Sequence, residues 1–460
     1  MLHMMLNIKG SLLLSVFFLL GFSPVWAQTT PGYSLQQLID SANHNSHLPS
    51  IRAYQVQEKM SKLKEDKIKR YPSVTLDGSY QYNFMLPQIT IPAGTIGSVT
   101  TGTGATQLLP SDASKFTIGS KSTYNIGLNV YQPITQQFKL KTGLSIDETE
   151  IMLSKKEQEK TALQLQLGVE QLYYGAIITQ KQTAAAKAKL ELAQARMYDI
   201  QGSLLAGKTT GVSLAGLRAE IAAQDQNILK LDFQKQDYLA ELARLTGLDA
   251  ETLKLQEPEL TSTTSHSLET YKNAAFENPD MEIARLNKWK AMLALKAAKQ
   301  NNLPDFGLVA GYYVQQGSPV LPGNSPYVGL SLKWNIKDLF SNKELQNQRQ
   351  FQLKQAEENI AYTKRQKDID VEKAIRKVKQ SAALIEVSEK LVSFRKEALK
   401  EQQDKQASGL DIKTALLETM SQLADAETDL YSAQLSNVLA MAELRNLSGM
   451  TKSAASDNLR

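Results

Sequence analysis

The chain has 460 residues, of which 42% are hydrophobic and 22% charged, and this composition excludes an intrinsically disordered protein. Its net charge is only +5 and no clustered basic face stands out, so we expect no nucleic-acid partner. The absence of cysteine excludes disulfides, thiol catalysis and thiolate metal sites.

The sequence offers little support for catalysis or for a bound cofactor. His44 and His47 are spaced i, i+3 on a predicted helix, but no third metal ligand follows at a suitable spacing. The chain also lacks a glycine-rich phosphate loop and a nucleophile paired with a histidine base. We therefore expect no enzyme activity, no metal and no cofactor.

Residues 1–27 have the features of a secretory signal peptide. Lys9 precedes an apolar run over residues 11–22, and the small residue Ala27 marks the expected cleavage site. The run is too short to span a bilayer, and no later stretch approaches about 20 continuous apolar residues. We expect an exported protein in which any membrane crossing is made by strands.

The mature chain repeats itself at a fixed distance. Three pairs of glycines lie 202 residues apart, namely Gly127 and Gly329, Gly207 and Gly409, and Gly247 and Gly449. A single offset shared by all three pairs indicates an internal duplication. We expect a first repeat over residues 28–247, a linker over 248–265, a second repeat over 266–449 and a polar tail over 450–460.

Each repeat has the same predicted elements in the same order. For the first repeat we expect a helix over 34–70, strands over 73–84 and 123–134, a long helix over 137–204 and a medium helix over 212–245. For the second we expect a helix over 267–302, strands over 305–315 and 326–336, a long helix over 338–407 and a medium helix over 411–446. Residues 85–122, rich in Gly, Thr, Pro and Ser, are expected to form a long loop that is much shorter in the second repeat.

The four predicted strands alternate apolar and polar residues, and several carry aromatic residues at their ends. Two interpretations fit: a soluble antiparallel sheet with one wet face, and a membrane barrel whose apolar side chains face lipid. Four strands cannot close a barrel, because the smallest membrane barrels have about eight, and an open edge is not tolerated in lipid. In the barrel interpretation three chains share twelve strands. The lipid-facing residues are then Val74, Leu76, Tyr80, Tyr82, Ile126, Leu128, Val130, Phe306, Leu308, Tyr312, Val328, Leu330, Leu332 and Trp334.

The predicted long helices contain no proline and are patterned in heptads. At about 1.5 Å per residue, each extends about 100 Å. Spacing by seven predicts coiled-coil packing. Heptad positions in the second long helix are Val371, Val378, Ile385, Val392 and Leu399.

Helix lengths also suggest how the columns are built. Placed end to end, the helices over 212–245 and 267–302 match the length of one long helix, so we expect two columns per repeat, one continuous and one spliced. The predicted fold is mainly α with a small membrane β part. Three chains complete a duct of twelve helical columns under twelve strands.

Glycine-containing turns follow both long helices. The sequences are GKTTG over 207–211 and SGLD over 408–411, and a glycine after a helix explains the helix end by itself. These turns lie at the far end of the expected cylinder, where a partner would dock. The candidate docking and gating residues are Gly207, Lys208, Gly211, Ser408, Gly409 and Asp411.

The ordered set of motifs resembles the TolC-like outer-membrane efflux proteins of Gram-negative bacteria over about residues 33–449. No single motif is decisive, and the resemblance rests on the duplicated plan and on the order of the motifs along the chain. They include Asn278-Pro279, Tyr71-Pro72, Leu303-Pro304, the phrase YNIGLNVYQPI over 124–134, Leu245-Thr246-Gly247, Leu447-Ser448-Gly449 and the glycine tips.

The resemblance implies a homotrimer in the outer membrane with a long periplasmic helical barrel. It also implies a periplasmic adaptor at the helical tips and an inner-membrane transporter, in a tripartite efflux or type I secretion system. Family members often carry an acidic pattern after the second tip. Here Ala415 and Ser213 stand where aspartate is often found, and Glu418 retains part of the implied acidic ring at the aperture.

A second hypothesis is a soluble periplasmic coiled-coil adaptor or structural rod. It shares the export signal and the heptads, but it does not explain four alternating strands with aromatic ends. Release from membranes in high salt is expected of a rod, whereas a barrel requires detergent.

Overall fold

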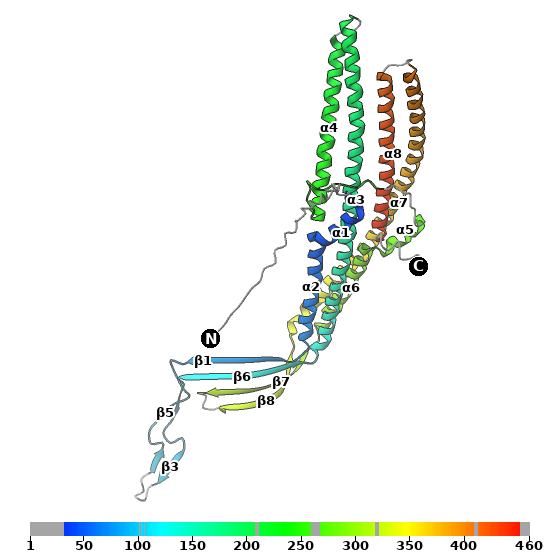
Figure 1. Ribbon diagram of the computed structural model, residues 1–460. Coiled ribbons are helices and arrows are strands. Elements are labelled where there is room, and N and C mark those ends of the chain that lie inside the picture. The colour runs from blue at the N-terminus through cyan, green and yellow to red at the C-terminus, as the bar shows by residue number, and fades with distance from the viewer. Residues whose placement is uncertain are drawn as a thin grey trace, which may run out of the picture.

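The computed structural model describes residues 32–100, 102, 104, 106–207, 211–258, 267–317, 322–408 and 413–450. The expected signal peptide, residues 259–266 of the expected linker and the tail from residue 451 lie outside these ranges. The molecule is elongated, with two long helical hairpins at one end and a four-stranded sheet at the other (Figure 1).

Helices form most of the described chain. They are α1 (Leu35–Asn45), α2 (His47–Ile68), α3 (Gln136–Leu205), α4 (Gly211–Thr246), α5 (Leu268–Ala274), η1 (Ala275–Glu277, a 3-10 helix), α6 (Pro279–Gln300), α7 (Ile336–Ala407) and α8 (Lys413–Leu447). The strands are β1 (Ser73–Tyr82), β2 (Gln88–Ile91), β3 (Gly97–Thr100), β4 (Thr106–Leu109), β5 (Ser114–Thr117), β6 (Ser122–Pro133), β7 (Asp305–Gln316) and β8 (Asn324–Lys333). The long helices α3 and α7 have 70 and 72 residues.

The expected single helices over 34–70 and 267–302 are wrong, because each is broken near its start. Ser46 has extended backbone (φ −69°, ψ 138°), and its hydroxyl accepts a hydrogen bond from the Leu48 amide as the N-cap of α2. Asn278 caps α6 in the same way, with Pro279 at the first helical position. A proline in the first turn is compatible with a new helix but not with a continuing one.

The expected loop over 85–122 is also wrong, because it contains strands. β2 pairs with β5 and β3 pairs with β4, and both pairs are antiparallel. They project beyond the main sheet as an arm (Figure 1), and in the sequence this arm lies between β1 and β6. Each strand has four residues, which is too short for a period-two pattern to identify.

Four helical columns lie side by side in each chain. α4 and the α1–α2 pair line one side of α3, and α8 and α6 line its other side, with α7 packed beyond them. The spliced columns therefore join α4 to α1–α2 and α8 to α6. The expected joining of helices 212–245 and 267–302, which belong to different repeats, is wrong.

At both joints an asparagine side chain donates hydrogen bonds to the end of the adjoining helix. At the first, the Asn45 side chain donates a hydrogen bond of 3.0 Å to the Thr246 carbonyl at the end of α4. At the second, the Asn278 side chain donates to the carbonyls of Asn446 and Leu447 at the end of α8, at 3.0 and 2.7 Å. An amide thus satisfies helix-end carbonyls that have no partner within their own helix.

Gly247, just after α4, has little space at its joint. Its φ of +70° favours glycine, and an added Cβ would lie 2.9 Å from the Cβ of Asn45. Gly207, after α3, has the same φ of +70° but nothing within 4 Å of an added Cβ. These two glycines therefore form a matched pair in which only the packing differs.

We expect Gly247→Ala to lower the free energy of unfolding by about 2–3 kcal/mol, because it adds a clash to backbone strain. Gly207→Ala should lower it by about 1 kcal/mol, from strain alone. Chemical denaturation of both variants in detergent measures the difference. Equal losses would show that the joint relaxes around the new methyl group.

The main sheet has the strand order β1-β6-β7-β8, and all neighbours are antiparallel. β1 follows α2, β6 precedes α3, β7 follows α6 and β8 precedes α7. The strands therefore lie in the same order as the columns to which they connect. Each column continues into one strand. The outer columns connect to the edge strands: α1–α2 connects to β1, and α7 connects to β8.

Two apolar clusters hold the columns together near the joints. The larger cluster packs α1, α3 and α4 against the start of the linker, and it includes Leu38, Tyr173, Leu242 and Leu253, each at most 5% exposed. The Tyr173 hydroxyl also donates a hydrogen bond to the Gln256 carbonyl. The second cluster packs α5 and α7 against α8. The described start of the linker is thus part of the core.

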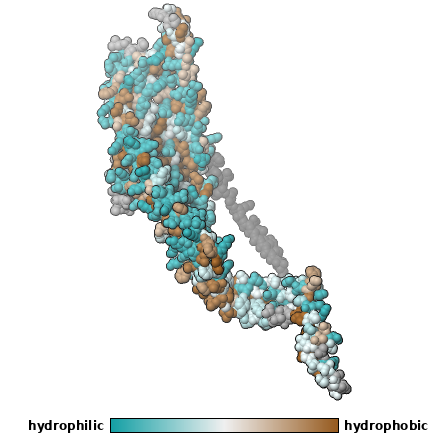
Figure 2. All heavy atoms as spheres, turned by 180° about the vertical axis from the view of Figure 1, so that it is seen from behind, coloured by the Kyte–Doolittle hydropathy of each residue, from teal (hydrophilic) through white to brown (hydrophobic). Residues whose placement is uncertain are grey.

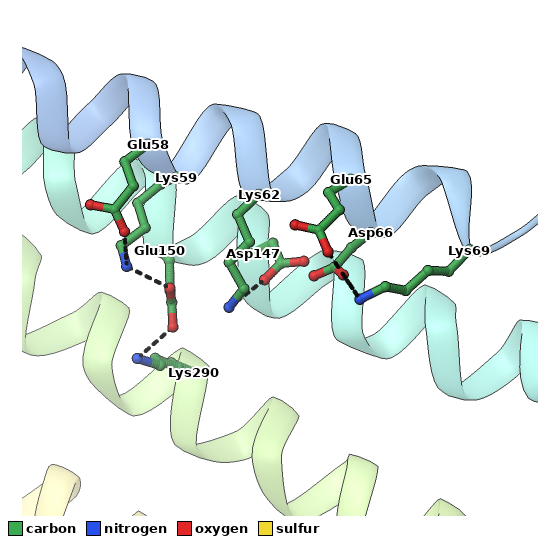
Figure 3. A network of polar contacts seen from close by, with 9 residues as sticks. All are labelled: Glu58, Lys59, Lys62, Glu65, Asp66, Lys69, Asp147, Glu150 and Lys290. Carbon is green, nitrogen blue, oxygen red and sulfur yellow. Dashed lines mark hydrogen bonds and ion pairs between the residues drawn. The ribbon is translucent and has the colours of Figure 1, made fainter.

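Charged side chains tie α3 to the helices on both of its sides, as Figure 3 shows. Glu150 of α3 forms ion pairs with Lys59 of α2 at 3.6 Å and with Lys290 of α6 at 3.0 Å. Asp147 of α3 pairs with Lys62 of α2 at 3.5 Å. Burial, together with a hydrogen bond to Asp66, raises the pKa of Asp147.

Asp280, at the start of α6, joins three helices. Its carboxylate contacts Lys160 of α3 at 2.7 Å and Lys367 of α7 at 2.5 Å. Burial alone would raise its pKa, but the two lysine hydrogen bonds outweigh burial, and the pKa of Asp280 lies below its usual value.

A lowered pKa in the folded state means that the ionised Asp280 stabilises the fold above the unfolded-state pKa of about 3.9. This contribution is lost as the pH falls through the lower, folded-state pKa. We expect the stability difference between the native protein and Asp280→Asn to be largest at neutral pH and to shrink as the pH falls below about 4. Denaturation at several pH values tests this, and a difference that grows on acidification would contradict it.

Candidate functional site: the strand sheet and the helical tips

Strand register places the expected lipid-facing residues of the four strands on one face. Val74 lies opposite Val130, and Leu76 opposite Leu128, which in turn lies opposite Tyr312. Between the last two strands, Phe306 lies opposite Leu332, Leu308 opposite Leu330 and Ala310 opposite Val328. All of the expected residues except half-buried Val130 are exposed, from 41% for Phe306 to 81% for Val328. A continuous apolar face of this kind is typical of a surface that needs a nonpolar partner.

The opposite face of the sheet is polar and built on glycines. Asp77, Asn129 and Tyr313 are among the residues that line a hollow of about 430 Å³ on it. Tyr131 lies over Gly307 and Tyr327 over Gly311, so that a side chain at either glycine would collide with a ring.

Exposed apolar side chains also gather where the helices meet the sheet (Figure 2). Trp334, directly after β8, donates a hydrogen bond from its indole nitrogen to the Asn302 carbonyl at 3.3 Å. Aromatic residues of this kind are typical of the boundary between a membrane and water. The exposed residues at this boundary include Ile68, Tyr71, Phe138, Trp334, Ile336 and Phe340.

Helix α7 is apolar on two opposite sides. Val371, Ala374 and Val378 are buried toward the other helices. The other stripe is exposed by 53–80% although its members are large, and at 3.6 residues per turn it lies on the reverse side of the helix. It consists of Phe340, Phe351, Tyr362, Ile369, Val387 and Phe394.

The opposite outer column shows the same arrangement. On α4, Leu229 and Phe233 are 54% and 60% exposed, on the side away from buried Leu242 and Leu245. On α2, Tyr54 is 68% exposed. Both outer columns thus present apolar side chains away from their own chain.

The tips are only partly described. Gly207 follows α3 with φ +70°, Gly211 begins α4, and Ser408 caps α7 with its hydroxyl donating to the Asp404 carbonyl at 2.9 Å. The candidate residues Lys208, Gly409 and Asp411 lie outside the described residues.

Just behind the tips, polar contacts link the two hairpins through α3 and α8. Arg196 pairs with Glu418 at 3.1 Å, and the Thr414 hydroxyl donates to the Asp199 carboxylate. Farther from the tip, Lys189 pairs with Asp425 at 2.9 Å.

The sequence analysis named Glu418 as part of an implied acidic ring at the aperture, and it did not predict these links or their other residues. A signal was present, since Lys189 and Arg196 are seven residues apart and so are Glu418 and Asp425. Opposite charges at heptad spacing on two antiparallel helices indicate paired faces.

Metal ligation has no support in the described part of the chain, where no group of three His, Asp or Glu residues is placed to hold an ion. His44 instead contacts the Asp40 carbonyl through its Nδ1 at 2.8 Å. Among the described residues, no helix is both long enough and apolar enough to cross a membrane.

Long helical hairpins joined to a small sheet are the fold shared by solved outer membrane channels. The model of the outer membrane efflux protein family matches residues 52–248 and 270–450, and the chain belongs to this family. The protein is accordingly an efflux duct of the outer membrane with a large periplasmic part. The expected family resemblance and the mainly α fold with a small β part are confirmed.

Solved outer membrane channels share this fold at low sequence identity. CmeC of Campylobacter jejuni matches with a TM-score of 0.71 and 15% identity over 92% of this chain and 88% of that one. VceC of Vibrio cholerae matches with 0.70 and 15% over 90% and 96%. MtrE of Neisseria gonorrhoeae, in an open state, matches with 0.60 and 16% over 90% and 89%. No curated protein matches the chain in sequence.

Proposed function

We propose that three copies of this chain form the passive exit duct of a tripartite export system. A periplasmic adaptor and an inner-membrane transporter deliver the substrate, which then passes along a continuous aqueous path to the cell exterior. The single observation that carries this proposal is the shared order of four columns and four strands with both edges open. The duct performs no chemistry, and the transporter supplies the energy.

The two edges of the main sheet are different strands, so edge can meet edge only if the copies are arranged head to tail. Among the strands that the structure describes, β1 and β8 each pair along one side only, and an unpaired backbone is not tolerated in lipid. The two outer helical columns, which connect to these edge strands, carry the exposed apolar stripe of α7 on one side and the exposed apolar residues of α2 and α4 on the other. A head-to-tail interface that closes generates a ring, and three copies supply twelve strands, above the minimum of about eight.

The apolar face of the sheet then contacts lipid, and the polar face lines the lumen. The adaptor docks at the tip turns, around Gly207, Lys208, Gly211, Ser408, Gly409 and Asp411. The periplasmic gate opens when α3 and α8 separate behind these turns, which requires the Arg196–Glu418 and Asp199–Thr414 contacts to break.

The assembly is tested by membrane extraction and by the mass of the extracted particle. We expect the protein to stay in the membrane in about 1 M salt, which screens surface charge pairs. Detergent should release it as a trimer. Release by salt alone as a monomer would favour the periplasmic rod. The family match does not favour that alternative.

Phe351→Glu probes the interface directly, because it places a charge on the exposed stripe of α7. We expect the trimer fraction to fall strongly, since burial of a Phe side chain contributes about 1.5–3 kcal/mol at each of the three interfaces. Tyr198→Glu is the matched control, since Tyr198 is also a large exposed residue (78%) but lies on α3, an inner column. A trimer that survives Phe351→Glu unchanged would exclude this stripe from the interface.

A further inference from the structure

The hollow on the polar face of the sheet contains one charged group. In the four strands of the main sheet, the charged residues are Asp77, Asp305 and Lys333. Asp305 and Lys333 lie opposite each other at the helical end, and Asp305 forms an ion pair with Lys139 at 2.7 Å. Asp77 lies midway along β1, and none of the ion pairs between described residues involves it. Its charge is therefore available to a ligand.

A chain of hydrogen bonds fixes the position of the Asp77 carboxylate. The Tyr327 hydroxyl of β8 donates to the Asn129 side-chain oxygen of β6, and the Asn129 amide nitrogen donates to Asp77 Oδ2 at 2.7 Å. The Thr75 hydroxyl donates to the same Oδ2 at 3.4 Å. A carboxylate has about four acceptor positions. Between described residues no hydrogen bond reaches the other oxygen, Oδ1, so its acceptor positions are available to a ligand.

Glycine makes this chain of hydrogen bonds possible. Tyr327 reaches from β8 to β6 across the intervening strand β7, where it passes over Gly311. A Cβ at position 311 would lie 2.6 Å from the tyrosine ring. Gly127 forms part of the floor of the same hollow. The hollow is thus shaped by the absence of side chains at particular positions.

Aromatic rings complete the hollow. The rings of Tyr313 and Tyr327 lie 6.5 Å apart with their planes at 41°, and both residues line the hollow together with Asp77. The face of an aromatic ring attracts cations, and a quaternary or protonated amine benefits more than a strongly hydrated metal ion. A carboxylate, amide oxygens and ring faces around one hollow are the groups that recognise an organic ammonium ion.

We propose that this hollow is a binding subsite for organic cations at the outer end of the duct. The inference rests on the proposed function, which turns the polar face toward the lumen. In the closed ring, three copies place three Asp77 carboxylates at one level of the lumen. Rings of carboxylates are a common basis of cation preference in channels. Organic cations therefore bind at this level as they leave the duct.

The experiment is ion conductance of the full-length trimer in a planar bilayer, with spermidine added to the compartment that faces the strands. We expect spermidine to block the current, and Asp77→Asn to weaken this block about tenfold, the effect of losing about 1.4 kcal/mol of binding. Tyr313→Leu should weaken block by spermidine but not block by Mg²⁺, because only the amine uses the ring. Asp112→Asn, on the exposed arm beyond the sheet, is the matched control and should leave the block unchanged.

The outcomes separate the subsite from the duct. Conducting trimers whose spermidine block is insensitive to Asp77→Asn would overturn the subsite and leave the duct intact. Block that depends on Asp77 but not on Tyr313, and equally for spermidine and Mg²⁺, would overturn the preference for organic cations. Trimers that carry no current in any variant would overturn the duct, and the subsite with it.

Discussion

Transport is expected to fall to the level of cells lacking the protein when Asp199→Cys on α3 is joined to Thr414→Cys on α8 by a disulfide. The two native side chains already touch, because the Thr414 hydroxyl donates a hydrogen bond to Asp199. The proposed gate opens by separation of α3 and α8 at this level, and a covalent bond prevents that separation. Efflux from cells and conductance of trimers, each before and after reduction, measure the effect.

The controls use the absence of native cysteine. Each single variant lacks a second thiol in its own chain, and gel electrophoresis without reductant identifies any bond between chains. Glu418→Gln supplies the reciprocal result, because it removes the ion pair to Arg196 and should raise the resting conductance. Full transport with the internal bond formed would place the gate elsewhere.

Arg445→Met is expected to destabilise the fold by about 3–5 kcal/mol, the largest effect among the single substitutions considered. Arg445 of α8 pairs at 3.4 Å with Glu170 of α3, which is only 2% exposed. Gln166 donates one further hydrogen bond to Glu170 at 3.1 Å. Burial, reinforced by the nearby Glu170 charge, raises the pKa of Tyr174. Loss of the arginine leaves a buried carboxylate without its counter-ion.

A second variant separates the loss of a pair from the loss of a side chain. Glu170→Leu combined with Arg445→Met removes both charges and should recover most of the stability. Arg244→Met, near the end of α4, is the matched control, because the Arg244–Glu241 pair is exposed and should contribute less than about 1 kcal/mol. Denaturation in detergent provides the values. A small loss for Arg445→Met would mean that water reaches Glu170.

The four strands of the main sheet were the part of the fold most accessible from sequence. Alternation with period two assigns each residue to a face without knowledge of any partner, so the apolar set from Val74 to Leu332 lies on one side of the observed sheet. The heptad positions were also informative, since Val371, Val378 and Val392 are at most 7% exposed. Local periodicity is sufficient for both, because each depends on geometry within one element.

The helix breaks at Ser46 and Asn278 had local signals that the length of the amphipathic pattern obscured. Each is a capping residue followed within three positions by proline, which marks a new helix start. The arm over β2–β5 had no such signal, since its strands of four residues are defined by pairing rather than by pattern.

For the polar links near the tips, heptad spacing marks the charged faces of the two helices, but it does not say which residues meet. Arg196 meets Glu418 only because α3 and α8 are in a particular axial alignment, and a heptad pattern is unchanged when one helix slides along the other by seven residues. The joints set that alignment, through Asn45 at Thr246 and Asn278 at Leu447. Whether the tip residues bind an adaptor stays a prediction.

The spliced construction of two columns has a mechanical consequence. α3 and α7 are unbroken rods, whereas the neighbouring columns are interrupted at Asn45–Thr246 and at Asn278–Leu447. Bending or torque applied to α4 or α8 at the tip is dissipated at the interruption, because hydrogen bonds at a joint yield more readily than a continuous helix. We therefore expect the periplasmic end to open by movement of α4 and α8 while the strands keep their arrangement in the lipid.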